Sequence, residues 1–204
     1  FLTLNSDGSL PVDPVYPGAP AAWLGRSVAG VGDVNGDGYD DYFVGAPRTD
    51  EVPSSLNTPG AAYVIYGNAS GTGVNLTSGT IASSNGFRIS GYSDKILGVS
   101  VSGLGDINGD GFADVMVSGT AGSGSWGTPS APVTFVVYGK ANRTTLVLSD
   151  SIAATDGARL TGSQYSYFGG SINGAGDVNG DGLADFIIGA YNQGNNNNNV
   201  IGGG

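Results

Sequence analysis

The chain contains no cysteine and no histidine, and only seven of its 204 residues are lysine or arginine. Disulfide bonds, thiol nucleophiles, histidine acid–base pairs and zinc sites built from histidine or cysteine are therefore excluded. The shortage of cations also excludes a nucleic-acid binder, because phosphate contacts depend on lysine and arginine. No apolar run approaches the roughly 18–20 residues of a membrane-spanning helix, so we expect no membrane insertion.

What remains is an acidic chain that is rich in glycine. Its net charge is −10, and 38 of its residues are glycine. Apolar residues make up 39% of the chain, which is enough for a packed core and argues against global disorder. The glycines separate short runs of β-branched and aromatic residues, a pattern typical of all-β proteins with many tight turns.

One segment of the sequence occurs three times. Residues 24–47, 97–120 and 168–191 align without gaps, and ten of the 24 aligned columns are identical in all three copies. Each repeating unit offers about four short strand candidates, and in the first unit these are 26–31, 42–46, 61–66 and 86–90. Nothing in the chain has a sustained helical period. Repeated units of four strands are typical of propeller blades.

We therefore predict an all-β fold of propeller-type blades, with three units and an incomplete ring. The predicted lead-in, rich in proline, is 1–23, and the two complete blades are 24–96 and 97–167. The incomplete third blade, with a tail rich in asparagine and glycine, is 168–204. No role is assigned to the run Asn195–Asn199.

The centre of each repeat is an acidic loop, at residues 33–41, 106–114 and 177–185. In the first acidic loop, Asp33, Asn35, Asp37 and Asp41 occupy positions 1, 3, 5 and 9. Side chains two residues apart can converge on one point if the backbone curls, and the intervening glycines permit such a curl. The carbonyl group at position 7 can supply a further oxygen.

Oxygen ligands in this number suit Ca²⁺, whereas Mg²⁺ ranks second because it demands a stricter octahedron. We predict three calcium sites with the ligands Asp33, Asn35, Asp37, Tyr39, Asp41, Asp106, Asn108, Asp110, Phe112, Asp114, Asp177, Asn179, Asp181, Leu183 and Asp185. Substitution of Asp37, Asp110 or Asp181 is expected to abolish one site each, with little effect on the other two.

A polar turn is the alternative interpretation, because Asp, Asn and Gly are the usual turn residues. Recurrence of the same four oxygen-bearing residues in three loops argues against it, as does the mutual repulsion of three close carboxylates without a cation. An EF-hand or dockerin loop is excluded by the apolar residues Val44, Val117 and Ile188 at position 12, where those loops carry an acid.

The pattern resembles the FG-GAP repeat of integrin α-subunit β-propellers and their bacterial relatives. Leu24-Gly25, Leu97-Gly98 and Phe168-Gly169 precede the acidic loops, and Gly45-Ala46-Pro47 follows the first of them. The second and third units depart from the motif, with Ser118-Gly119-Thr120 and Gly189-Ala190-Tyr191. The resemblance implies blades of four antiparallel strands, with calcium bound between the first two strands of a blade.

The resemblance also implies a secreted or cell-surface module for adhesion or scaffolding, with an extracellular protein or glycan as partner. A self-assembling subunit of an extracellular filament or surface layer is the alternative, because three units cannot close a propeller ring. A non-catalytic part of a secreted hydrolase is a further alternative. We expect no enzyme, since the chain has no GxSxG, P-loop or HExxH motif.

Three sequons, at Asn68, Asn75 and Asn142, fit the N-glycosylation pattern. A chain with this content of asparagine, serine and threonine is expected to contain about three by chance, so glycosylation is only a candidate modification.

Overall fold

The computed structural model describes residues 23–47, 59–71, 73–76, 79–92, 95–121, 131–163 and 166–191. The predicted lead-in up to residue 22 and the tail from residue 192, with its Asn195–Asn199 run, lie outside these residues. Every regular element in the described part of the chain is a strand. It contains no helix that is long and apolar enough to cross a membrane.

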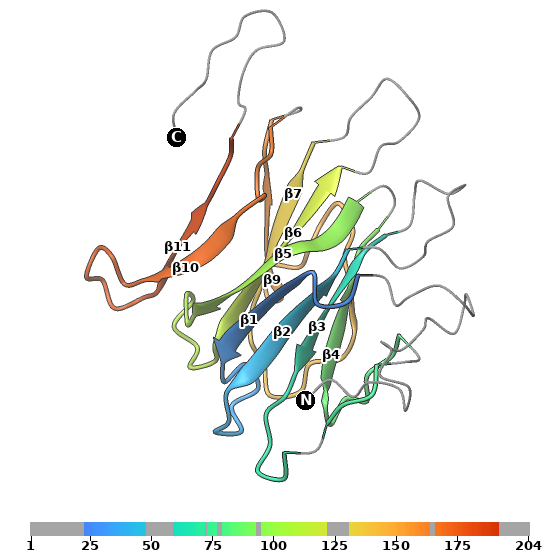
Figure 1. The fold of residues 1–204 in the computed structure, drawn as a ribbon. Helices are drawn as coiled ribbons and strands as arrows, with labels where there is room; N and C mark the ends of the chain where they lie inside the picture. Colours follow the sequence, from blue (N-terminus) through green and yellow to red (C-terminus); the bar gives the residue numbers. More distant parts are fainter. Residues whose placement is uncertain are drawn as a thin grey trace, which may run out of the picture.

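Within the described residues, eleven strands form three sheets that lie side by side as blades (Figure 1). The first blade has the order β1 (Ser27–Gly32), β2 (Asp41–Ala46), β3 (Ala61–Ile65) and β4 (Gly86–Ser90). The second has the order β5 (Lys95–Gly105), β6 (Asp114–Ala121), β7 (Val133–Val137) and β9 (Gly157–Thr161), and the third consists of β10 (Ile172–Gly176) and β11 (Asp185–Ile188). Neighbouring strands within these blades are all antiparallel.

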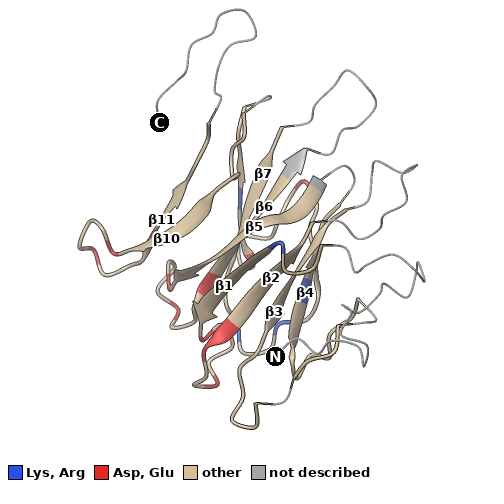
Figure 2. Cartoon of the chain, viewed as in Figure 1, with Lys and Arg blue, Asp and Glu red and all other residues tan. Residues whose placement is uncertain are grey.

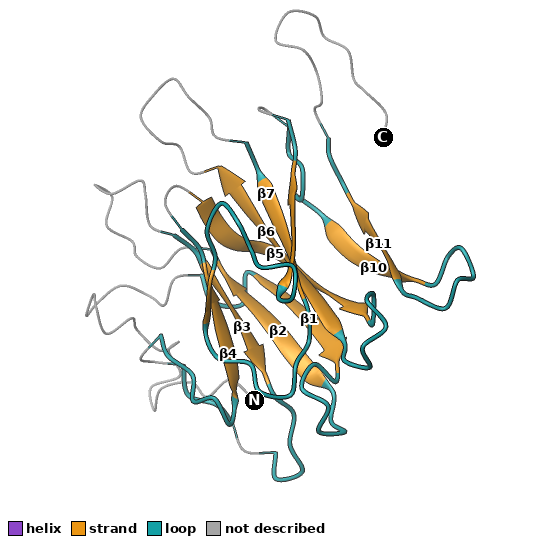
Figure 3. Cartoon of the chain, turned by 180° about the vertical axis from the view of Figure 1, so that it is seen from behind, coloured by secondary structure: helices purple, strands orange, loops and turns teal. Residues whose placement is uncertain are grey.

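For the described part of the chain, the view from behind shows strands and loops alone, without a closed ring (Figure 3). The four strands predicted for the first unit are confirmed, each with ends within one residue of the expected ones. The fourth strand of each complete blade leads directly into the first strand of the next blade, as in a propeller. The predicted fold class of incomplete propeller blades is therefore confirmed.

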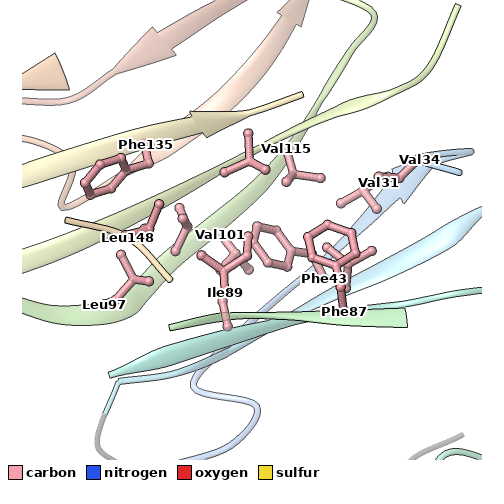
Figure 4. Close-up of a cluster of buried hydrophobic side chains, with 14 of the residues drawn as sticks. Val31, Val34, Phe43, Phe87, Ile89, Leu97, Val101, Val115, Phe135 and Leu148 are labelled. Atoms are coloured by element: carbon pink, nitrogen blue, oxygen red, sulfur yellow. The ribbon is translucent and has the colours of Figure 1, made fainter. Parts of the chain in front are cut away.

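The main hydrophobic core lies between the first and second blades (Figure 4). Phe43 and Ile89 contribute from the first blade, and Val115 and Phe135 from the second. Val44, the neighbour of Phe43, belongs instead to a second cluster on the opposite face of the first blade. Side chains alternate between the two faces of a strand, so a strand that packs on both faces carries an uninterrupted apolar run. In β2, the residues between Tyr42 and Ala46 are accordingly Phe43, Val44 and Gly45.

Glycine allows the backbones of neighbouring blades to approach each other closely. Gly98 lies at a bulge in β5 with φ at +90°, and a Cβ there would lie 2.3 Å from the carbonyl oxygen of Ala61. A Cβ on Gly45 would lie 2.2 Å from the carbonyl oxygen of Gly98. Gly169 repeats this arrangement at the next junction, where a Cβ would lie 2.4 Å from Oγ1 of Thr134. Gly98 of the second unit and Gly169 of the third unit therefore each pack on the preceding blade.

An eleventh strand that the sequence did not predict joins the first two blades. The two-residue strand β8 (Leu146–Val147) belongs to the loop between β7 and β9, and it pairs in parallel with β4 of the first blade. The N–H group of Leu148 donates to the carbonyl of Ser90 at 3.0 Å, and the Leu148 side chain is 2% exposed in the main core. The second blade therefore adds a fifth strand to the sheet of the first.

We expect Leu148→Ala to lower the free energy of unfolding by about 2–4 kcal/mol, because it removes a buried leucine at this junction. Val147→Ala is the matched control: its side chain is 71% exposed, so its effect should stay within about 0.5 kcal/mol. Urea unfolding of both variants measures the difference. Equal effects of the two substitutions would show that β8 does not join the blades in solution.

Candidate metal centre

The three acidic loops lie at the same edge of the molecule, where they connect β1 to β2, β5 to β6 and β10 to β11. Figure 2 shows acidic residues gathered at these strand ends. Each loop begins directly after the first strand of its blade and returns into the second. The blade therefore holds both ends of the loop at fixed positions.

The aspartate at position 1 closes each loop on its own backbone. In the first loop, Oδ1 of Asp33 accepts hydrogen bonds from the N–H groups of Gly36 at 2.6 Å and Asp37 at 3.1 Å, and Oδ2 accepts one from Gly38 at 2.8 Å. Asp106 and Asp177 accept the corresponding three bonds in the second and third loops. The predicted curl is confirmed, since the glycines at positions 4 and 6 have φ between +76° and +90° in all three loops.

The side chains at positions 3 and 5 also accept hydrogen bonds within the loop. Oδ1 of Asn35 accepts from the N–H of Asp37 at 3.0 Å, and Oδ1 of Asp37 accepts from the N–H of Tyr39 at 2.9 Å. The same pairs of bonds occur in the other two loops. The repeated sequence thus produces three loops with one hydrogen-bonding pattern.

The aspartate at position 9 is the first residue of the following strand. Oδ2 of Asp41 accepts from the N–H of Val34 at 2.9 Å, and Oδ1 accepts from the N–H of Gly67, just beyond β3, at 2.8 Å. Asp114 makes the equivalent bonds to Ile107 and Gly139. Both carboxyl groups are buried, and this burial raises the pKa of each to about 6 although the N–H donors act in the opposite direction.

Position 9 of the third loop differs in its surroundings. Asp185 accepts a hydrogen bond from the N–H of Val178 at 2.8 Å. Its side chain is only partly buried, since the described part of the third blade has two strands.

The donor set of the loops fits a hard cation. Every predicted ligand is a carboxylate, amide or backbone oxygen, which are the ligands that Ca²⁺ and Mg²⁺ take in proteins. Within the described residues, no three or more acidic side chains converge closely enough to hold a metal ion by themselves. The three calcium sites stay a prediction, in which the Asn35 amide oxygen and the Tyr39 carbonyl, or their equivalents, would coordinate besides the carboxylates.

Two features of this edge were missed by the sequence analysis. The first is the bond between Asp41 and Gly67, which ties the loop to the end of β3. The second is contact between successive loops, in which Phe112 and Leu183 at position 7 lie against Gly36 and Gly109 of the loop before. The aligned repeats show an apolar residue at position 7, but they do not show what it contacts.

The three sequon asparagines, Asn68, Asn75 and Asn142, are all exposed. In the first sequon, the hydroxyl of Ser70 donates to Oδ1 of Asn68 at 2.5 Å. Glycosylation at these positions stays a prediction. Mass spectrometry of the protein from its source tests it.

The chain is similar to known proteins with the same repeat. The FG-GAP repeat matches residues 24–65 and 168–201. Integrin alpha-V of Gallus gallus is 32% identical over 173 residues, which is 84% of this chain and 15% of that protein. Integrin alpha-4 of Xenopus laevis is 29% identical over 177 residues, covering 83% of this chain and 14% of that protein. Integrin alpha-3 of Cricetulus griseus is 29% identical over 195 residues, which is 95% of this chain and 16% of that protein.

The chain thus spans about 15% of the length of these relatives. The two matched regions include the first and third acidic loops, and the second unit, with its altered Ser118-Gly119-Thr120, lies between them. The repeat found in the sequence, the blades and these similarities agree: the chain carries FG-GAP repeats in two regions, and most of its length is similar to part of the integrin alpha subunits.

Proposed function

We propose that this chain is a calcium-binding, non-catalytic module of FG-GAP blades that serves adhesion or scaffolding outside the cell. The observation that carries the calcium assignment is the same oxygen-lined loop built three times, with one hydrogen-bonding pattern in each. The similarity to integrin alpha subunits supports the adhesion role and the extracellular location. An extracellular protein or glycan is the proposed class of partner.

In each loop, the side chains at positions 1, 3, 5 and 9 and the backbone carbonyl at position 7 would hold one ion. The bound ion would neutralise carboxylates that otherwise repel one another. Burial of Asp41 and Asp114 supports this assignment, because a buried carboxylate requires compensation by a positive charge or by hydrogen-bond donors. Three ions would change the formal net charge from −10 to −4.

Isothermal titration of the chelator-treated protein with CaCl₂ tests the assignment. We expect three bound ions per chain, and two after Asp37→Ala, Asp110→Ala or Asp181→Ala. Asp40→Ala is the matched control, because it removes one acidic charge from position 8, where the other loops carry alanine; it should still bind three. No heat of binding in the unsubstituted protein, or equal losses in the control, would contradict the proposal.

Self-assembly is the second candidate function, favoured by the outer face of the first blade. Val28 and Tyr42 are 65% and 56% exposed there, beside a hollow of about 390 Å³ that is also lined by Phe43, Val44 and Ile65. In the second blade, Val101 and Val115 occupy the aligned positions and are buried against the first blade. The face is therefore shaped to pack on another blade.

Light scattering after size-exclusion chromatography tests whether that blade comes from a second copy. A mass that increases with protein concentration, and a monomeric mass for Val28→Asp, would support assembly. A monomer at all concentrations would exclude it.

A further inference from the structure

Successive acidic loops contact each other in the same way at both junctions. A Cβ on Gly36, at position 4 of the first loop, would lie 2.6 Å from Cε1 of Phe112, at position 7 of the second loop. A Cβ on Gly109 in the second loop would lie 3.2 Å from Cδ2 of Leu183 in the third. The apolar side chain at position 7 therefore covers a glycine of the loop before it.

A backbone hydrogen bond accompanies each of these contacts. The N–H of Ala113, which follows Phe112, donates to the carbonyl of Asp33 at 2.9 Å. The N–H of Ala184, which follows Leu183, donates to the carbonyl of Asp106 at 3.2 Å. Each loop thus supports the residue at position 1 of the preceding loop, whose carboxylate closes that loop.

A second connection exists between the first and second loops. Asp114 accepts a bond from the N–H of Gly139, and the next N–H, of Lys140, donates to the carbonyl of Val34 at 2.9 Å. The N–H of Val34 in turn donates to Asp41. Three hydrogen bonds, joined by the backbone of Gly139–Lys140 and of Val34, therefore connect the two buried aspartates at position 9.

We propose that Phe112 and Leu183 are positioning residues that couple neighbouring loops, so that calcium bound in one loop raises the affinity of the loop before it. This inference rests on the proposed calcium function. The carbonyl of Phe112 is a proposed ligand in the second loop, while its ring and the following N–H lie on the first loop. Fixing this residue in the second loop leaves less conformational freedom for the first loop to lose on binding, which produces positive cooperativity.

Electrostatic repulsion between bound ions predicts the opposite effect, in which calcium in the second loop lowers the affinity of the first. The second loop carries three acidic side chains, so its formal charge is −1 when calcium is bound. In Asp110→Ala, the empty loop would carry −2 and would attract calcium to the first loop more strongly. A loss of affinity in the first loop therefore cannot be an electrostatic effect.

The experiment is a CaCl₂ titration followed by ¹H–¹⁵N NMR. The amides of Gly38, Gly111 and Gly182 report on one loop each, because each donates to the position-1 aspartate of its own loop. The sequence alone predicts little effect of Asp110→Ala on the other sites, but the contacts between the loops lead to a different expectation. We expect Asp110→Ala to raise the dissociation constant reported by Gly38 about fivefold or more, the lower end of usual coupling between sites. By reciprocity, Asp37→Ala should weaken the second loop by the same factor.

Phe112→Ala keeps the backbone carbonyl but removes the ring. In this background Asp110→Ala should change the affinity of the first loop less than twofold. Phe112→Leu, which copies the third loop, should retain the coupling and serves as the folded control. Amide exchange of Gly36, which should slow on calcium loading of the second loop only when the ring is present, gives a second readout.

The outcomes are distinct. If calcium changes the chemical shift of none of the glycine amides, both the proposed calcium function and the coupling are wrong. If the amides shift but Asp110→Ala leaves the first loop unchanged or tighter, the loops bind independently and only the coupling is wrong. If the coupling persists in Phe112→Ala, the ring does not carry it, and the assignment of Phe112 is overturned.

Discussion

Removal of calcium is expected to lower the melting temperature by about 15 °C or more. Binding to the folded state alone stabilises by about 3 kcal/mol per site when calcium is about 100 times the dissociation constant, and each kcal/mol shifts the melting temperature of a chain of this size by about 2–4 °C. Three sites therefore contribute about 8 kcal/mol. Differential scanning calorimetry in CaCl₂ and in EDTA, at equal ionic strength, measures the shift.

The control for this prediction is a protein with Asp37→Asn, Asp110→Asn and Asp181→Asn combined. Its melting temperature should be the same with calcium and with EDTA. Replacement of calcium by magnesium in the unsubstituted protein should restore only part of the stability, because magnesium prefers a stricter octahedron. An unchanged melting temperature of the unsubstituted protein in EDTA would contradict the calcium assignment.

Gly98→Ala is expected to be the most destabilising single substitution at the blade junction. Its φ of +90° costs a residue with a side chain about 1–2 kcal/mol, and the new Cβ would lie 2.3 Å from the carbonyl oxygen of Ala61 and 2.9 Å from the amide nitrogen of Ala46. Forcing the two backbones apart adds about 1–3 kcal/mol. Chemical denaturation should therefore show a loss of about 2–5 kcal/mol.

The repeat supplies matched controls for this substitution. Gly25 is the aligned glycine of the first unit, with φ at +86°, and a Cβ added to it would have no other atom within 4 Å, so Gly25→Ala should show the strain alone. Gly169→Ala should be intermediate, because the nearest atom to its Cβ is the side-chain Oγ1 of Thr134 rather than a backbone atom. If Gly25→Ala and Gly98→Ala lower the free energy of unfolding equally, the close approach of the blades is not the reason that position 98 requires glycine.

The strands and the loop conformation could be predicted because they depend on local sequence. Apolar runs such as Val115-Met116-Val117, which is buried throughout, predict strands buried on both faces, and glycines at positions 4 and 6 predict the positive φ that the structure contains. Three copies strengthened each of these predictions. A single copy would have left a polar turn as an open alternative.

Contacts between units could not be predicted in the same way, because an alignment of repeats places equivalent residues together rather than residues that touch. Gly98 and Gly45 stand in different columns of the repeat, yet they meet across the blade junction. Strand β8 has only two residues, too few for a pattern, and it forms because Leu148 reaches the core next to β4. Within the first unit, the bond from Gly67 to Asp41 was not predicted either, because it joins residues 26 apart in sequence.

The central claim is that each acidic loop is a calcium site, and a crystal structure of the protein grown with CaCl₂ tests it most directly. We expect one anomalous density peak inside each loop, bounded by the oxygens of positions 1, 3, 5, 7 and 9 at the calcium–oxygen distance of about 2.3–2.6 Å. Loops that keep the hydrogen bonds described above but contain only water at saturating calcium would contradict the account.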